Sequence, residues 1–372
     1  MSDKRLRRRA KQARRDARRL AAYKRKPSDE DLVSHIRGAL AKGHPLGLLA
    51  VVSYLIFRSQ PDPLAKLSAP PEPLDLDVFI ANLVTENCRE TTAMLAVLAE
   101  LLVNEQDRQA RCRAEVSKRK HALPKWISAL PDIDARRVVR ATHVLGDTDE
   151  LIIGAQLAGR YDMTCTVRFD HNTFFEIDGV DITSGSMDGL LSGAVENNPD
   201  FTFTDMSAAD AGAWLRHGLD QPMFPRASDR FQEVLPLVRW LSAHLPDGGA
   251  EYQRPEWDWS QLSELFGTFF ATPAGAPFND YECRWLLEEL VESGTGDPLR
   301  WSVTRIEQVL GPWSYTHNFD MESTLAVPDL LRAFVPFAHA QSGVRDELTA
   351  EVIAAIDRKA RGFRREVLRD AI

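Results

Sequence analysis

The sequence contains few cysteines, four in 372 residues, and they are widely spaced. None of them lies in a Cys-x-x-Cys pair, so neither a zinc ribbon nor a disulfide framework is indicated. Cys165 alternates with apolar neighbours in an expected strand, which is typical of a small core residue. This cysteine usage predicts a reduced, cytoplasmic protein.

Familiar catalytic and cofactor-binding motifs are also missing. The chain has no G-x-x-x-x-G-K-[ST] phosphate loop, no G-x-G-x-x-G after a strand, no G-x-S-x-G elbow and no H-E-x-x-H. Its nine histidines are scattered singly. We therefore predict a non-enzymatic protein that needs no cofactor.

No hydrophobic run is long enough to span a bilayer. The strongest run covers residues 46–57, whereas a membrane helix needs about 20 apolar residues. This run is better interpreted as a buried core helix. No apolar stretch closely follows the basic N-terminus and no small-residue cleavage site appears, which argues against a secretory signal.

Charge is abundant, and it is unevenly distributed along the chain. Residues 1–26 contain thirteen Lys and Arg against Asp3 and Asp16, a net charge of +11. The other 346 residues contain 33 basic and 52 acidic residues, a net charge of −19. The formal net charge of −8 therefore conceals a basic arm, residues 1–26, attached to an acidic body.

The basic arm has the composition of a nucleic-acid tether. Dense Arg and Lys bind polyanions by releasing condensed counterions, and contacts to phosphates carry no base identity. We predict sequence-independent association with RNA, the ribosome or DNA. The predicted contacts are Arg7, Arg8, Arg9, Lys11, Arg14, Arg15, Arg18 and Arg19. In the main alternative the arm docks on the protein's own acidic body as part of a regulatory scaffold. Binding of the arm to a membrane surface is not favoured, because its apolar stripe consists mostly of alanine.

Two further basic clusters would extend this footprint if they lay on the same side, although such clusters are more often solvated helix faces. The first contains Arg108, Arg111, Arg113, Lys118, Arg119, Lys120 and Lys125. The second contains Arg358, Lys359, Arg361, Arg364, Arg365 and Arg369 near the C-terminus.

An acidic turn region supplies the alternative functional hypothesis. It holds Asp170, His171, Glu176, Asp178 and Asp181 on adjacent expected strands. Carboxylates and an imidazole so placed can coordinate a divalent cation or share acid–base work, as in a metal-dependent enzyme of unrecognised type. Their spacing matches no known metal site, and polar residues are also usual on the exposed face of a sheet.

The periodicity of the sequence predicts an α+β fold. Residues 27–130 are expected to form a helical N-terminal domain with a Pro-rich strap at 60–73, and residues 131–372 an α+β domain. Four short segments, at 136–145, 149–156, 162–169 and 173–182, predict an antiparallel β meander over 136–182. Residues 186–372 are expected to be a helical, Trp-rich half with seven of the eight tryptophans after residue 200.

The C-terminal third carries one resemblance, through the stretches 297–302, 311–313 and 330–335. These resemble the C-terminal helical part of an uncharacterised actinobacterial protein family, and the Arg- and Ala-rich composition fits that source. The resemblance implies no activity and no catalytic residues. The acidic C-terminal half is further expected to offer a docking surface for a second protein.

Overall fold

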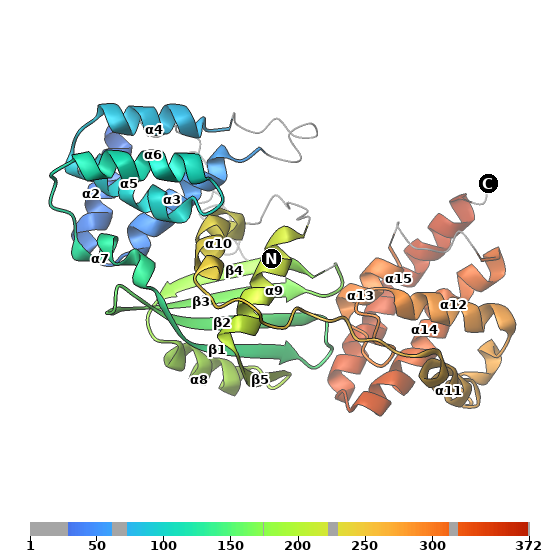
Figure 1. The fold of residues 1–372 in the computed structure, drawn as a ribbon. Helices are drawn as coiled ribbons and strands as arrows, with labels where there is room; N and C mark the ends of the chain where they lie inside the picture. Colours follow the sequence, from blue (N-terminus) through green and yellow to red (C-terminus); the bar gives the residue numbers. More distant parts are fainter. Residues whose placement is uncertain (1–28, 62–72, 174, 222–229, 312–318, 371–372) are drawn as a thin grey trace, which may run out of the picture.

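The computed structural model describes residues 29–61, 73–173, 175–221, 230–311 and 319–370 (Figure 1). Helices at both ends of the chain flank a five-stranded antiparallel sheet, which confirms the predicted α+β class. The predicted arm, residues 1–26, and most of the Pro-rich strap lie outside the described residues.

The N-terminal helices confirm the prediction that the strongest apolar run, residues 46–57, is a buried core helix. They are α2 (Asp29–Lys42), α3 (Leu46–Ser59), α4 (Leu76–Thr85), α5 (Arg89–Leu101), α6 (Gln106–Lys118), α7 (Lys125–Ser128) and the short η1 (Leu130–Asp132). The apolar run forms α3, where Leu48, Leu49 and Val52 are fully buried. Packing of this helix inside a core removes its apolar surface from water, which is why its sequence is apolar on most sides.

The predicted meander is present over β1 (Asp134–His143), β2 (Thr148–Leu157), β3 (Tyr161–Asp170) and β4 (Glu176–Ser184). Neighbouring strands pair in antiparallel register, with Cys165 opposite Ile153 on β2 and Ile182 on β4. The side chains of Met163, Cys165 and Val167 alternate with polar neighbours and are buried on one face, as the period-2 pattern predicts.

A fifth strand, β5 (Phe201–Met206), corrects the expectation that residues 186–372 are helical. It follows α8 (Met187–Asn197) and pairs antiparallel with β1, which gives the strand order β4-β3-β2-β1-β5. The alternation Phe-Thr-Phe-Thr at 201–204 is the strand signal that the sequence reading missed.

The two faces of the sheet are covered differently. One face packs against α9 (Ala208–Asp220) and α10 (Leu235–Ala243), which follows η2 (Arg230–Val234), and it shares a core with the N-terminal helices. On the other face α8 buries a small cluster around Val139 and Ile152. The larger core therefore contains residues from both sides of residue 130. The predicted domain boundary at that residue stays a prediction.

The C-terminal helices enclose a second core of their own, seen on the right of Figure 1. They are α11 (Trp259–Phe270), η3 (Ala276–Phe278), α12 (Tyr281–Glu292), α13 (Val303–Val309), α14 (Met321–Ser342) and α15 (Asp346–Asp370). The guanidinium of Arg305 is buried in this bundle, stacks 4.0 Å from the ring of Trp301 and donates to the carbonyls of Val291 and Arg300. It satisfies carbonyl groups that would otherwise be buried without a donor.

The bundle meets the sheet through a small apolar cluster and one strong ion pair. Leu145, Val344 and Leu348 form the cluster. Beside it, Arg345 donates from Nε and Nη2 to the two carboxylate oxygens of Asp200, each at 2.7 Å. Bidentate geometry of this kind fixes orientation as well as distance.

Candidate functional site: charged surfaces and a buried Asp149–His171 cluster

The first basic cluster of the body is largely neutralised by carboxylates. Arg108 donates to Asp77 at 2.6 Å and also pairs with Glu105, and the hydrogen bond from Arg108 lowers the pKa of Asp77. The other surface pairs of the cluster are Arg111 with Asp77, Arg113 with Glu100, and Lys118 with Glu115. Carboxylates therefore pair with these four surface cations, whereas Lys120 and Lys125 are exposed and have no ion pair within the described residues.

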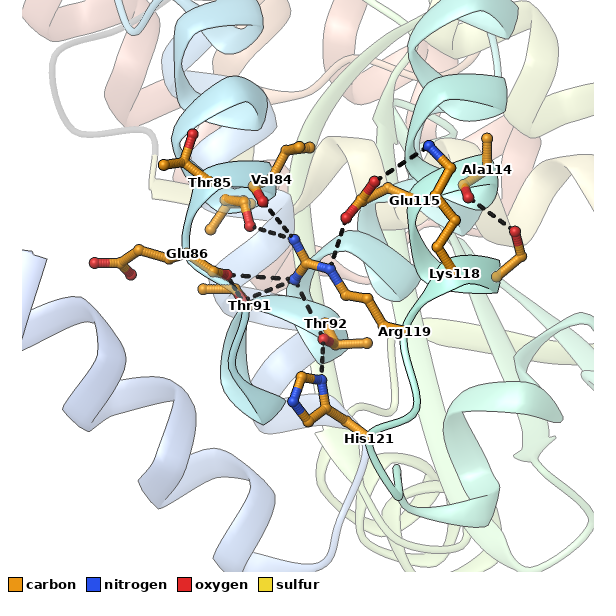
Figure 2. A network of polar contacts seen from close by, with 12 residues as sticks. Val84, Thr85, Glu86, Thr91, Thr92, Ala114, Glu115, Lys118, Arg119 and His121 are labelled. Carbon is orange, nitrogen blue, oxygen red and sulfur yellow. Dashed lines mark hydrogen bonds and ion pairs between the residues drawn. The ribbon is translucent and has the colours of Figure 1, made fainter.

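Arg119 belongs to the protein interior rather than to that surface. Its side chain is 1% exposed, and Figure 2 shows the guanidinium directed at the end of α4. It donates to the carbonyls of Leu83 and Val84 at 2.8 and 2.9 Å, and to Glu115 of α6, the helix that ends just before Arg119, at 2.9 Å. The last carbonyls of a helix have no partner within the helix, so Arg119 supplies donors that α4 lacks.

Replacing Arg119 by methionine is expected to lower the free energy of unfolding by about 2–3 kcal/mol, because buried carbonyls lose their donors. Lys118→Met is the matched control: Lys118 is 72% exposed, one residue away, and should change stability by less than about 0.5 kcal/mol. Urea denaturation followed by tryptophan fluorescence measures both. Equal stabilities of the two variants would show that the Arg119 network is not structural.

The second basic cluster, on α15, keeps part of its charge exposed. Lys359 pairs with Glu307 at 3.7 Å, and Arg364 pairs with Asp329 at 2.7 Å. Arg358, Arg361 and Arg365 are exposed, and within the described residues they have no ion pair. Their spacing of three and four places them on one face of the helix. We name these three residues the α15 arginine stripe.

The acidic turn region is not assembled as the alternative hypothesis expected. Asp178 accepts from Arg168 at 2.7 Å, and burial raises the pKa of Asp170. The ring of His171 hydrogen-bonds to Asp149, a carboxylate that the alternative hypothesis did not include. In the part of the chain that the structure describes, no group of three or more His, Cys, Asp or Glu side chains could hold a metal ion.

Asp149 and His171 form the core of a buried polar cluster. Asp149 lies on β2, and its side chain and that of His171 are each 2% exposed. His171 Nε2 donates to Asp149 Oδ2 at 2.8 Å. Arg140 on β1 donates to both carboxylate oxygens, at 2.9 and 2.8 Å, and Thr142 donates to Oδ1 at 2.5 Å.

Hydrogen bonding determines the charge of Asp149. Burial alone would raise its pKa, but hydrogen bonds from His171, Arg140 and Thr142 outweigh that effect and lower the pKa to about 2. The carboxylate is therefore ionised at neutral pH, and four donors occupy its two oxygens.

Aromatic rings enclose the cluster. Tyr252 stacks on the His171 ring with centroids 4.5 Å apart, and Arg140 lies 4.7 Å above the ring of Trp214. Burial raises the pKa of Tyr252 to about 12. His171 Nδ1 has no hydrogen-bond partner among the described residues, so no hydroxyl or thiol is placed there for proton transfer. The hydrogen bonds of the cluster connect β1, β2 and the β3–β4 turn.

Sequence reasoning missed Asp149 and Tyr252 as partners of His171, and Arg140 as a partner of Asp149. Asp149 lies 22 residues before His171, and only the pairing of β2 with β3 brings the two together. The register pairs Thr148 with Asp170, which places Asp149 beside the turn that carries His171. The cluster could therefore have been predicted only from the correct register of the β2–β3 hairpin.

The described residues contain no helix that is long and apolar enough to cross a membrane. All four cysteines are free, and Cys165 is fully buried, as its alternation with apolar neighbours predicted. Comparison with protein-family models, with curated proteins and with solved structures gives no match to this chain.

Proposed function

We propose that this protein associates with nucleic acid, as RNA, ribosomal RNA or DNA, through sequence-independent phosphate contacts of its basic arm. The separation of charge between the arm, at +11, and the remaining 346 residues, at −19, is the observation that carries the proposal. An arm of this charge density attracts a polyanion, while the acidic body repels it. Contact is thereby restricted to the arm and to the few exposed cations of the body. The proposed compartment is the cytoplasm.

The α15 arginine stripe is the part of the body best suited to join the contact. Its guanidiniums are exposed, and the described residues supply no carboxylate to pair with them. Most cations of the cluster around Arg108 differ, because Asp77, Glu100, Glu105 and Glu115 already pair with them. Phosphates would gain little from displacing those carboxylates, so α15 is the preferred second site.

Binding of the intact chain to a 30-nucleotide RNA and a 30-base-pair DNA, measured by fluorescence anisotropy, tests this function. We expect a Kd of about 10⁻⁶ M or tighter near 100 mM salt, and similar values for unrelated sequences of one nucleic acid, because phosphates carry no base identity. Purification with and without nuclease should show nucleic acid only in the untreated sample. A Kd weaker than about 10⁻⁴ M for both probes would contradict the proposal.

Changing Arg358, Arg361 and Arg365 together to glutamine is expected to reduce the slope of log K against log[salt] by about 2–3 on duplex DNA, since each phosphate contact adds about 0.9. The matched control changes the ion-paired Arg111, Arg113 and Lys118 to glutamine, which removes the same charge. The control should leave the slope nearly unchanged. Equal slopes for the two variants would show that α15 does not contact the nucleic acid.

A further inference from the structure

A groove of about 460 Å³ lies between α8 and the edge of the sheet. Met187 of α8 packs over Gly154 on β2, and the helix buries Val139 and Ala141 of β1 but leaves β5 more exposed. Val139 and Phe203 contribute from the strands, and Leu191 and Val195 from the helix. Val195 is 54% exposed, so the groove has an apolar lining that is open to solvent.

The strand beside this groove has one unpaired edge in the described fold. β5 is the last strand of the sheet and pairs only with β1. Along β5, the backbone N–H and C=O groups of successive residues point alternately toward β1 and away from it. The hydrogen bond from Val144 N to Asp200 O shows that Asp200 points toward β1, so the backbone groups of Phe203 and Asp205 point away. Within the described residues, no backbone hydrogen bond is made by those outward groups. Such an edge is a template for another strand.

The rim of the groove is acidic. Asp188, Glu196 and Asp205 lie there with a single cation, Arg137, which pairs with Asp205 at 2.8 Å and with Asp188 at 3.8 Å. Three carboxylates against one guanidinium leave a net negative charge. A second copy of this edge would bring the same excess and be repelled, whereas a segment with a basic side chain would be attracted.

We propose that the β5 edge and its groove bind an extended peptide segment of another protein as a sixth strand. Backbone hydrogen bonds would run to Phe203 and Asp205, and every second side chain of the peptide would project on the α8 face. An apolar side chain fits beside Phe203 and Val195, and a Lys or Arg fits the carboxylates of the rim. This interaction is independent of nucleic-acid binding by the arm.

Selection of a phage-displayed library of random ten-residue peptides on the full-length protein tests the proposal. We expect enrichment of sequences that alternate apolar residues and carry at least one Lys or Arg. Asp205→Pro removes an outward N–H but leaves the pairing with β1, whereas Asp205→Ala removes the same carboxylate and keeps the N–H. Synthetic copies of the enriched peptides should bind Asp205→Pro at least tenfold more weakly than Asp205→Ala.

Amide hydrogen exchange on the wild-type protein provides a readout that does not depend on the proline variant. A selected peptide should slow exchange at Phe203 and Asp205 at least tenfold. Failure to enrich such peptides, equal binding to the two Asp205 variants, or unchanged exchange at both amides would each overturn the proposal. A dimer in sedimentation that Asp205→Pro abolishes would also overturn it, because a second copy would then occupy the edge.

Discussion

Asp149→Asn is expected to lower the free energy of unfolding by about 3 kcal/mol at neutral pH, because it removes the charge that Arg140 and His171 surround. The substitution keeps the shape of the side chain, so the effect reports on charge and hydrogen bonding. Asp178→Asn is the matched control, since Asp178 pairs with the half-exposed Arg168 on the same sheet. The control should cost less than about 1 kcal/mol. Urea denaturation of both variants measures the difference.

The contribution of Asp149 should also depend on pH. Its pKa is lowered from 3.8 to about 2 in the folded protein, so the ionised form stabilises the fold. That stabilisation, about 2.5 kcal/mol, is complete above the unfolded pKa and is lost as the pH falls through the folded pKa. The stability gap between wild type and Asp149→Asn should therefore narrow below about pH 4. A gap that stays constant from pH 6 to pH 3 would show that Asp149 is not held ionised.

Removing residues 1–26 is expected to weaken binding to RNA and DNA by at least about 10³-fold near 100 mM salt, since roughly eight phosphate contacts are lost. A full-length variant in which the eight predicted arm residues are changed to glutamine controls for chain length. It should lose affinity to a similar extent, because the effect is one of charge. Retained affinity in the protein that lacks residues 1–26 would mean that the body binds the nucleic acid.

Much of the fold is predictable because the spacing of apolar residues along a segment matches the burial of those residues in the folded protein. The alternation of Met163, Cys165, Val167 and Phe169 predicts a half-buried strand, and β3 has that face in the core. The long apolar run predicts α3 for the same reason. β5 was missed because it is six residues long and lies among helical segments, where its pairing with β1 is not visible locally.

The polar clusters are less predictable because their geometry depends on distant partners. Arg119 lies among basic residues in the sequence, but its donors meet the end of α4, more than 30 residues away. His171 was grouped with Asp170 and Glu176, whereas its partner is Asp149 on another strand. Charge counting shows how much positive charge a segment carries, and only the fold shows which cations are already paired.

The most direct test of the account is the salt dependence of duplex DNA binding by the intact chain and by residues 27–372. For the intact chain we expect a slope of log K against log[salt] of about −7 or steeper, from eight or more phosphate contacts. The shortened chain should give a slope no steeper than about −3, from the α15 arginine stripe alone. Equal slopes for the two proteins would contradict the claim that the basic arm holds the nucleic acid.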